Sequence, residues 1–133
     1  MSDGSEVARF HVLLAEDDEV NQDIVRAFLA DTGNLKLTIA SDGREALEAA
    51  MLSRFDLMII DQNMPHITGD RLIRHLRAGR TNNASTPVIR FTAEADARPP
   101  EIRIINGISE ATLPKPLRKD ALVSMITALL DIK

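Results

Sequence analysis

The segment from Leu57 to Pro65, with the sequence L-M-I-I-D-Q-N-M-P, places the strongest constraint on what this chain can fold into. Its first four residues are apolar without helical spacing, which predicts a strand buried on both faces, as in a parallel sheet covered by helices. The strand ends at Asp61, and the Met64-Pro65 pair prevents its continuation. In open sheets of this kind, ligands and reactive groups gather at the carboxyl ends of the strands. Asp61 is therefore either a reactive group at that edge or a residue that caps a turn.

Further segments share this strand character, and helical patterns separate them. After the first strand, apolar residues recur at helical spacing at Val20, Ile24, Ala27 and Phe28, which predicts a helix, and Gly33-Asn34 supplies a stop. The predicted strands span residues 10–15, 35–40, 57–61, 88–91 and 109–113.

Capping signals place the next two helices. Asp42 precedes Glu45 by three residues, the spacing of a capping box. Thr68 can cap a third helix, which should end near Gly79. A last helix follows the fifth strand, with its apolar face formed by Leu122, Met125, Ile126, Leu129 and Leu130.

The segment between the fourth and fifth strands is the least regular. Pro99-Pro100 forbids a helix running through it, so we expect a short helix that starts at Pro100 and stops by Asn106-Gly107. Strands that alternate with helices in this way predict an α/β fold with a parallel sheet and helices on both faces. Right-handed crossovers bring every carboxyl end to one edge of that sheet.

Length and composition limit the classes of protein to which this chain can belong. A chain of 133 residues forms one domain, which we place at residues 10–133 after a flexible N-terminal tail at residues 1–9. No apolar run is long enough to cross a bilayer, and the start M-S-D-G-S-E lacks the features of a secretory signal, so we expect a cytoplasmic protein that does not bind membranes. The absence of cysteine excludes disulfides and thiolate sites. The net charge of -4 and the aromatic content of 3% argue against direct binding to nucleic acid.

Polar residues follow the predicted strands where their carboxyl ends meet. Glu16 and Asp17 follow the first strand, Asp61 ends the third, Thr92 follows the fourth and Lys115 the fifth. Carboxylates gathered at one edge repel one another unless a cation neutralises them, and oxygen ligands favour Mg²⁺. A carboxylate, a hydroxyl and a lysine at a Mg²⁺ site are the groups that phosphoryl transfer requires.

These motifs, in this order, resemble the receiver domain of two-component response regulators, the chemotaxis-regulator type. The resemblance rests on E-D after the first strand, D-Q-N-M-P after the third, T-A after the fourth and L-P-K-P before the last helix, and it extends from about Phe10 to Ile132. The E-D-D-E-V-N-Q run is most similar to receivers of hybrid histidine kinases. The resemblance implies a flavodoxin-like, doubly wound sheet of five parallel strands in the order 2-1-3-4-5.

The resemblance also implies a function and roles for the residues. The function is that of a phosphoacceptor in a phosphorelay, which takes a phosphoryl group from a histidine kinase or a histidine phosphotransfer protein and then switches its interaction surface. The domain would catalyse its own modification and dephosphorylation and would not be a turnover enzyme. In that scheme Asp61 is the phosphoacceptor, Asp17 and the Asn63 carbonyl join it on Mg²⁺, and Glu16 acts through a metal-bound water. Thr92 bonds the phosphoryl group, Lys115 pairs with it before a cis peptide bond to Pro116, and Asn63 and Glu94 flank the path of the hydrolytic water.

Two features depart from the family pattern. The position three residues before Lys115, commonly aromatic in the family, is Thr112, and the proline-limited fourth helix lies on the face through which many receivers signal. We therefore expect residues 93–107 to couple the phosphorylation site to the interaction surface.

Two other functions stay open. An aspartyl phosphohydrolase would need a second carboxylate where Asn63 stands, whereas a phosphorylation-independent interaction module would keep the fold without the chemistry.

Overall fold

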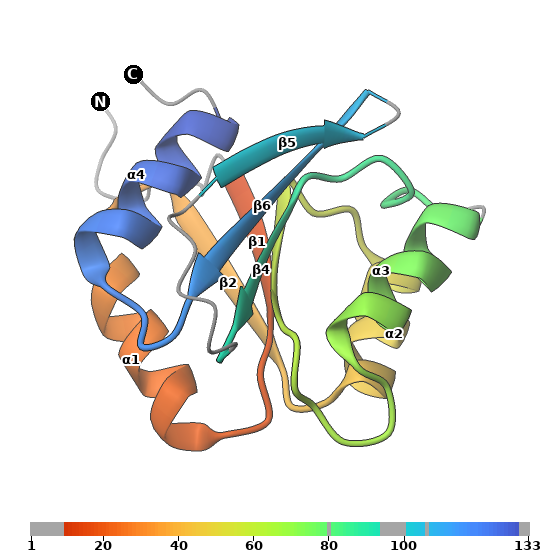
Figure 1. Cartoon of the computed structure of the whole chain (residues 1–133), viewed down its shortest axis with the longest axis horizontal. Coiled ribbons are helices and arrows are strands. Elements are labelled where there is room, and N and C mark those ends of the chain that lie inside the picture. Colours follow the sequence, from red (N-terminus) through yellow and green to blue (C-terminus); the bar gives the residue numbers. More distant parts are fainter. Residues whose placement is uncertain (1–9, 80, 94–100, 106, 131–133) are drawn as a thin grey trace, which may run out of the picture.

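A computed structural model describes residues 10–79, 81–93, 101–105 and 107–130 of the chain. A six-stranded sheet in the order β2-β1-β3-β4-β6-β5 lies between two pairs of helices (Figure 1). The α/β, flavodoxin-like fold predicted from the sequence is confirmed, with strands 2-1-3-4 in the expected parallel order. The elements are β1 Phe10–Ala15, α1 Glu19–Leu29, β2 Leu35–Ala40, α2 Gly43–Leu52, β3 Leu57–Asp61, α3 Gly69–Ala78, β4 Val88–Thr92, β5 Glu101–Ile105, β6 Ile108–Pro114 and α4 Lys119–Leu130.

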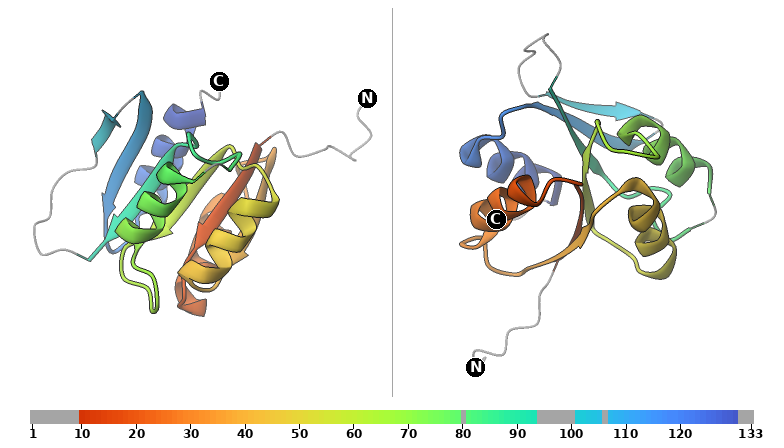
Figure 2. Two further views of the ribbon diagram at one scale, coloured as in Figure 1. Left: turned by 90° about the vertical axis from the view of Figure 1, so that its right-hand side faces the viewer. Right: turned by 90° about the horizontal axis from the view of Figure 1, so that it is seen from below.

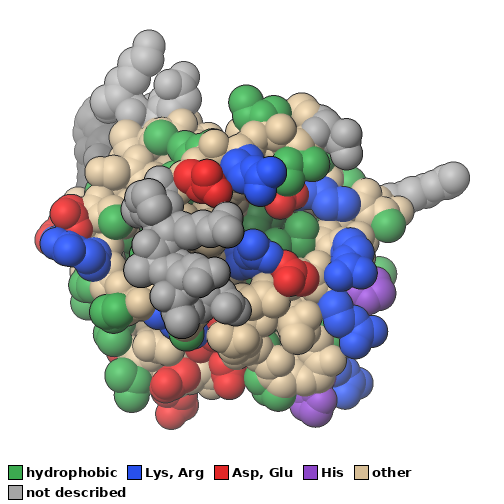
Figure 3. Space-filling view, viewed as in Figure 1, with side chains coloured by type: hydrophobic (Ala, Val, Ile, Leu, Met, Phe, Trp, Pro, Cys, Tyr) green, Lys and Arg blue, Asp and Glu red, His purple; other side chains and the backbone are tan. Residues whose placement is uncertain are grey.

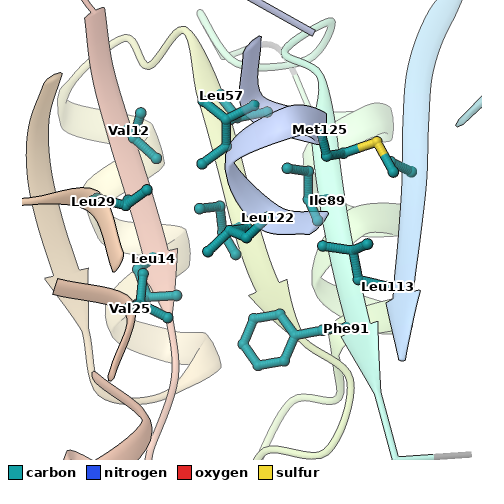
Figure 4. Close-up of a cluster of buried hydrophobic side chains, with 13 residues drawn as sticks. Val12, Leu14, Val25, Leu29, Leu57, Ile89, Phe91, Leu113, Leu122 and Met125 are labelled. Atoms are coloured by element: carbon teal, nitrogen blue, oxygen red, sulfur yellow. The ribbon is translucent and has the colours of Figure 1, made fainter. Parts of the chain in front are cut away.

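The sheet divides the core into two layers. On one face, α1 and α4 cover a cluster that includes Val12, Leu57 and Phe91 (Figure 4). On the other face, α2 and α3 cover a second cluster around Leu13 and Met58, and Figure 2 shows the helix pairs on opposite sides of the sheet. Every residue of β3 is buried, as predicted for a central parallel strand. No helix among the described residues has the length and apolar character needed to span a bilayer.

The predicted helix starts are confirmed by their capping contacts. The Asp42 carboxylate accepts a hydrogen bond from the Glu45 backbone N–H at 2.9 Å. The Thr68 side chain caps α3, and Gly79 follows its last residue. Each cap satisfies a backbone donor that has no partner within the helix, and it thereby fixes where the helix begins.

The first helix is confirmed as α1, but of the four apolar residues at helical spacing only Phe28 packs against the core. Val20 is 65% exposed and Ile24 37% exposed, whereas Gln22 is buried together with Val25 and Leu29. The Gln22 amide donates a hydrogen bond to the Glu16 backbone oxygen at 2.7 Å. This buried polar contact sets the rotation of α1, and an apolar pattern alone does not reveal it.

The expected short fourth helix is wrong, because β5 occupies residues 101–105 and pairs antiparallel with β6. Three of the five residues of β5 are isoleucine, and β-branched residues favour strands. Ile105 pairs with Ile108 across a two-residue connection that contains Gly107 at φ 80, a conformation that suits a tight hairpin turn. The predicted fifth strand is β6, next to β4, so the sheet gains a sixth, antiparallel strand at its edge.

On the face that turns toward α3, β4 and β6 carry polar side chains beyond the buried Val88. Arg90 of β4 lies beside Thr112 of β6 on that face. Arg90 pairs with Asp70 of α3, and Arg77 Nε lies 3.5 Å from the Glu110 carboxylate of β6. Acidic and basic side chains accordingly lie side by side over this part of the molecule (Figure 3).

Candidate phosphorylation site

Three carboxylates meet at the carboxyl ends of β1 and β3. Glu16 and Asp17 directly follow β1, and Asp61 is the last residue of β3. Each offers one oxygen, and these oxygens all lie within 4.8 Å of one another. Glu16 and Asp61 are buried whereas Asp17 is exposed, so the cluster opens to solvent on one side. The sequence predicted this cluster, and the parallel sheet assembles it.

Glu16 lies in an environment that disfavours its charge. The pKa of Glu16 is raised to about 7, mainly by burial and also by the charge of Asp61 and a side-chain hydrogen bond with Asp17. The Asp18 backbone N–H and the Lys115 ammonium group act in the opposite direction. One carboxylate oxygen, Oε2, accepts from the Asp18 N–H at 2.9 Å, while the buried Oε1 has no hydrogen-bond partner among the described residues.

Asp61 has one oxygen held by two donors. Lys115 Nζ lies 2.9 Å from Asp61 Oδ1, and the Asn63 backbone N–H donates to the same oxygen at 3.1 Å. The ammonium group also lies 5.4 Å from the centroid of the Phe91 ring. These contacts fix the orientation of the carboxylate at the end of β3.

Thr92 and Lys115 are joined through the backbone where β4 and β6 end. The Lys115 N–H donates to the Thr92 carbonyl oxygen at 2.9 Å, and the peptide bond from Lys115 to Pro116 is cis, as the family resemblance implied. The Thr92 hydroxyl is buried and has no hydrogen-bond partner among the described residues. A buried hydroxyl in this state can take up a new acceptor without first losing another bond.

The backbone after Asp61 is clamped by α3, a feature that the sequence analysis missed. A Cβ at Gly69 would lie 2.8 Å from the Asp61 backbone oxygen and 2.9 Å from Gln62 Cα, so only glycine fits. The Gln62 amide donates to Asp70 at 2.9 Å. A glycine directly after the predicted cap Thr68 was the available signal, because glycine is a poor helix former.

The structure describes two of the three remaining predicted residues, Asn63 and Thr112, but not Glu94. The Asn63 backbone contacts Asp61, and its side chain is exposed. Glu94 lies outside the described residues, so its role stays a prediction. Thr112 lies on β6 opposite Arg90, and no aromatic ring replaces it there.

The donor set fits a divalent cation. Carboxylate oxygens from three residues converge, and the unpartnered Oε1 of the buried Glu16 is the kind of atom that a cation or its bound water satisfies. Without a cation, the Lys115 ammonium group and the raised pKa of Glu16 reduce the repulsion within the cluster.

The sequence matches the model of a known protein family. The response regulator receiver domain family matches residues 12–127. The transcription factor SKN7 of Candida albicans is 33% identical over 126 residues, which are 94% of this chain and 22% of that protein. The aerobic respiration control sensor protein ArcB of Escherichia coli is 31% identical over 121 residues, which are 91% of this chain and 15% of that protein.

A solved structure has the same fold. The crystal structure of the receiver domain of sensor histidine kinase PA1611 from Pseudomonas aeruginosa, with a magnesium ion coordinated in its active site cleft, superposes with a TM-score of 0.76. The two sequences are 26% identical, and the match covers 93% of this chain and 99% of that one. This chain thus has the extent of one receiver domain, whereas it spans only a small part of the two curated relatives named above.

Proposed function

Because the chain belongs to the response regulator receiver domain family of two-component systems, we propose that it accepts a phosphoryl group on Asp61 from the phosphohistidine of a histidine kinase or a histidine phosphotransfer protein. The observation that carries this proposal is the buried Asp61 carboxylate, with Lys115 Nζ at 2.9 Å and two further carboxylates beside it. The domain would catalyse its own phosphorylation and dephosphorylation, with no turnover of a separate substrate. The cytoplasm, where histidine kinases present their phosphohistidine, is the proposed compartment.

The contacts of Asp61 support different proposed roles for its two oxygens. Oδ1 is held by Lys115 and by the Asn63 N–H, which leaves Oδ2 as the nucleophile. Oδ2 attacks phosphorus, the P–N bond of the phosphohistidine breaks, and the imidazole nitrogen keeps the bonding electron pair. Lys115 and the Thr92 hydroxyl are then the donors within this site for the phosphoryl oxygens.

Mg²⁺ would be held by the carboxylates of Glu16, Asp17 and Asp61 and, as the family resemblance implies, by the Asn63 carbonyl oxygen. The bound cation would neutralise charge on the transferred group.

If these residues share one cation site, Mg²⁺ should stabilise the fold by about 2.7 kcal/mol at a hundredfold excess over Kd. Asp17→Asn should raise the melting temperature of the metal-free protein, because it removes one repelling charge, and it should weaken the Mg²⁺ response. Unchanged values for both would contradict a shared cation site.

The surface next to the site suits a docking partner. Val20 and Ile24 are exposed on α1, which begins directly after the acidic residues. Exposed apolar side chains beside a reactive group provide contact area for the protein that delivers the phosphoryl group. Val20→Asp should therefore slow transfer from a phosphohistidine protein while leaving transfer from a small phosphodonor unchanged.

The decisive experiment is incubation with Mg²⁺ and acetyl phosphate, followed by intact-mass measurement. Wild type should gain one phosphoryl group. Asp61→Asn, which keeps the shape and removes the nucleophile, should gain none, whereas Asp23→Asn on the exposed side of α1 should behave like wild type. If wild type gains nothing, or if Asp61→Asn still gains a phosphoryl group, the proposal fails, and the first result favours the phosphorylation-independent interaction module.

A further inference from the structure

β5 is the outermost strand of the sheet, and among the described residues only β6 pairs with it. Figure 2 shows this edge in side view, away from the helices that cover the central strands. All five side chains of β5 are exposed, and Ile104 is 73% exposed. An edge strand presents a row of backbone N–H and C=O groups that can pair with another strand.

One face of β5 carries Glu101, Arg103 and Ile105, and the other carries Ile102 and Ile104. Glu101 and Arg103 pair with Thr112 and Glu110, on the side of the sheet that α3 covers. Ile102 and Ile104 point to the opposite side, where Ile102 pairs with Ala111, a member of the core cluster under α1 and α4. The three residues Glu101–Ile102–Arg103 therefore carry an acidic and a basic side chain on one face and an apolar one on the other.

We propose that β5 is a docking surface for a second copy of this chain, which pairs with it antiparallel about a two-fold axis through Ile102 and joins the two sheets into one. Reversal of Glu101–Ile102–Arg103 places each Glu101 opposite Arg103 of the second copy, and Ile102 opposite Ile102. The short strand is thus complementary to itself, as an isologous two-fold interface requires. Opposite charges directly across an antiparallel pair stabilise it.

The charges also select this register over the next possible one. A two-fold axis through Arg103 would place the two Arg103 side chains directly opposite each other, and like charges in that position destabilise a strand pair. The inference rests on the edge strand alone and is independent of phosphorylation at Asp61.

Charge exchange tests the proposal through self-association, measured by sedimentation equilibrium of the 133-residue chain. Glu101→Arg and Arg103→Glu should each weaken dimerisation about tenfold, because each replaces two attractive cross-strand pairs with two repulsive ones.

Recombining the charges should restore association. In a mixture of the two single variants, one chain carries a basic side chain at both positions and the other an acidic side chain at both, so every cross-strand pair of the heterodimer is attractive again. The double variant, which exchanges both charges, should associate as a homodimer. A wild type that stays monomeric at the highest attainable concentration, or a mixture no tighter than either variant alone, would overturn the proposal.

Cysteine cross-linking tests the register without relying on charge. The chain contains no cysteine, so a single introduced thiol is unambiguous. Two copies of Ile102→Cys would face each other directly, at a Cα separation of about 4.5 to 5.5 Å that a disulfide can bridge. Ile104→Cys is the matched control, since it is more exposed and on the same face but lies far from its own copy across the axis. Rapid dimer formation by Ile102→Cys alone supports the register, and equal or faster cross-linking by Ile104→Cys overturns it.

Discussion

At Glu16, burial is the main cause of a raised pKa, and this makes the stability of the metal-free protein depend on pH. Its pKa is about 7 in the fold against an ordinary value of 4.5. Between these values the folded state binds more protons than the unfolded state, so the free energy of unfolding should fall as pH rises from about 4.5 to about 7. We expect Glu16 to contribute a fall of about 1 to 3 kcal/mol, measured by urea unfolding in EDTA.

Comparison of variants isolates this contribution, because other groups titrate in the same range. Burial lowers the pKa of His11, so its contribution has the opposite sign and is lost as pH falls. Glu16→Gln should remove the fall, whereas Glu19→Gln, at an exposed position in the first turn of α1, should retain it. A pH profile that is the same in wild type and Glu16→Gln would show that Glu16 is ionised throughout.

Gly69→Ala should destabilise the protein even though alanine is the better helix former. The added Cβ would lie 2.8 Å from the Asp61 backbone oxygen, and forced contacts of this kind cost about 1 to 3 kcal/mol. Gly79→Ala is a milder control, since its nearest contact would be 3.1 Å from His75 O. The measurement is the urea unfolding midpoint of both variants, and a Gly69→Ala protein more stable than wild type would mean that the backbone near Asp61 can move aside.

The residues of the site could be predicted because each follows a recognisable strand. Asp61, Thr92 and Lys115 stand where apolar runs end, and parallel strands bring those ends together. The contacts that orient them could not be predicted in the same way. Gln22 contacts the Glu16 backbone because of how α1 is rotated, and Gly69 allows α3 to approach the Asp61 backbone closely. Neither contact produces a periodic pattern in the sequence.

Among the elements, the loop before β4 depends on one buried side chain. Asn83 is fully buried, and its amide donates to the Ala50 and Ser53 carbonyl oxygens at 2.5 and 2.6 Å. Its carbonyl oxygen accepts from the Phe55 N–H at 2.8 Å, so one side chain joins the end of α2 to the start of β3. The polar residues from Arg80 to Thr86 indicate a loop, but they do not reveal this contact.

Asn83→Ala should therefore destabilise the fold by about 3 kcal/mol, because it leaves several buried backbone groups without partners. Asn82→Ala, one residue earlier and exposed, should change the free energy of unfolding by less than about 0.5 kcal/mol. Chemical unfolding of the two variants provides the comparison. Equal effects would show that water or a neighbouring group replaces the Asn83 contacts.

The hairpin of β5 and β6 shows where prediction of an element fails. Pro100 suits the start of a helix, and the family pattern supplied a helix at this position, so both signals favoured the wrong state. The local signals for a hairpin were Ile102, Ile104 and Ile105 before Asn106-Gly107. Polar residues on one face of the next strand, Glu110 and Thr112, also indicate a face that is only partly buried.

At the scale of the whole molecule, β6 connects the site to the sheet edge. Lys115 follows β6 directly and contacts Asp61, and β5 pairs along the opposite side of β6. A phosphoryl group adds about -1.5 to -2 charges at Asp61, and Lys115 must rearrange around them. The predicted coupling segment, residues 93–107, lies partly outside the described residues, and most of its described part is β5.

We therefore expect beryllofluoride with Mg²⁺ to change amide hydrogen exchange most in residues 101–105 and 107–114, and less in α4. Arg90→Leu, which removes the ion pair with Asp70 from the polar face, should alter the exchange of these strands. Arg74→Leu on the exposed side of α3 is the matched control. Changes confined to α4 would place the output on that helix instead.

The order of the strands also bears on how the chain reaches its native state. The strands of each parallel pair are separated in sequence by a long crossover connection, whereas two residues connect β5 to β6. A hairpin of this kind closes in about 1 to 10 μs, and long-range parallel pairing is intrinsically slower. The strand that carries Lys115 toward Asp61 can therefore arrive at the nascent sheet already paired, with its outer edge occupied by β5 and only its inner edge free to find β4.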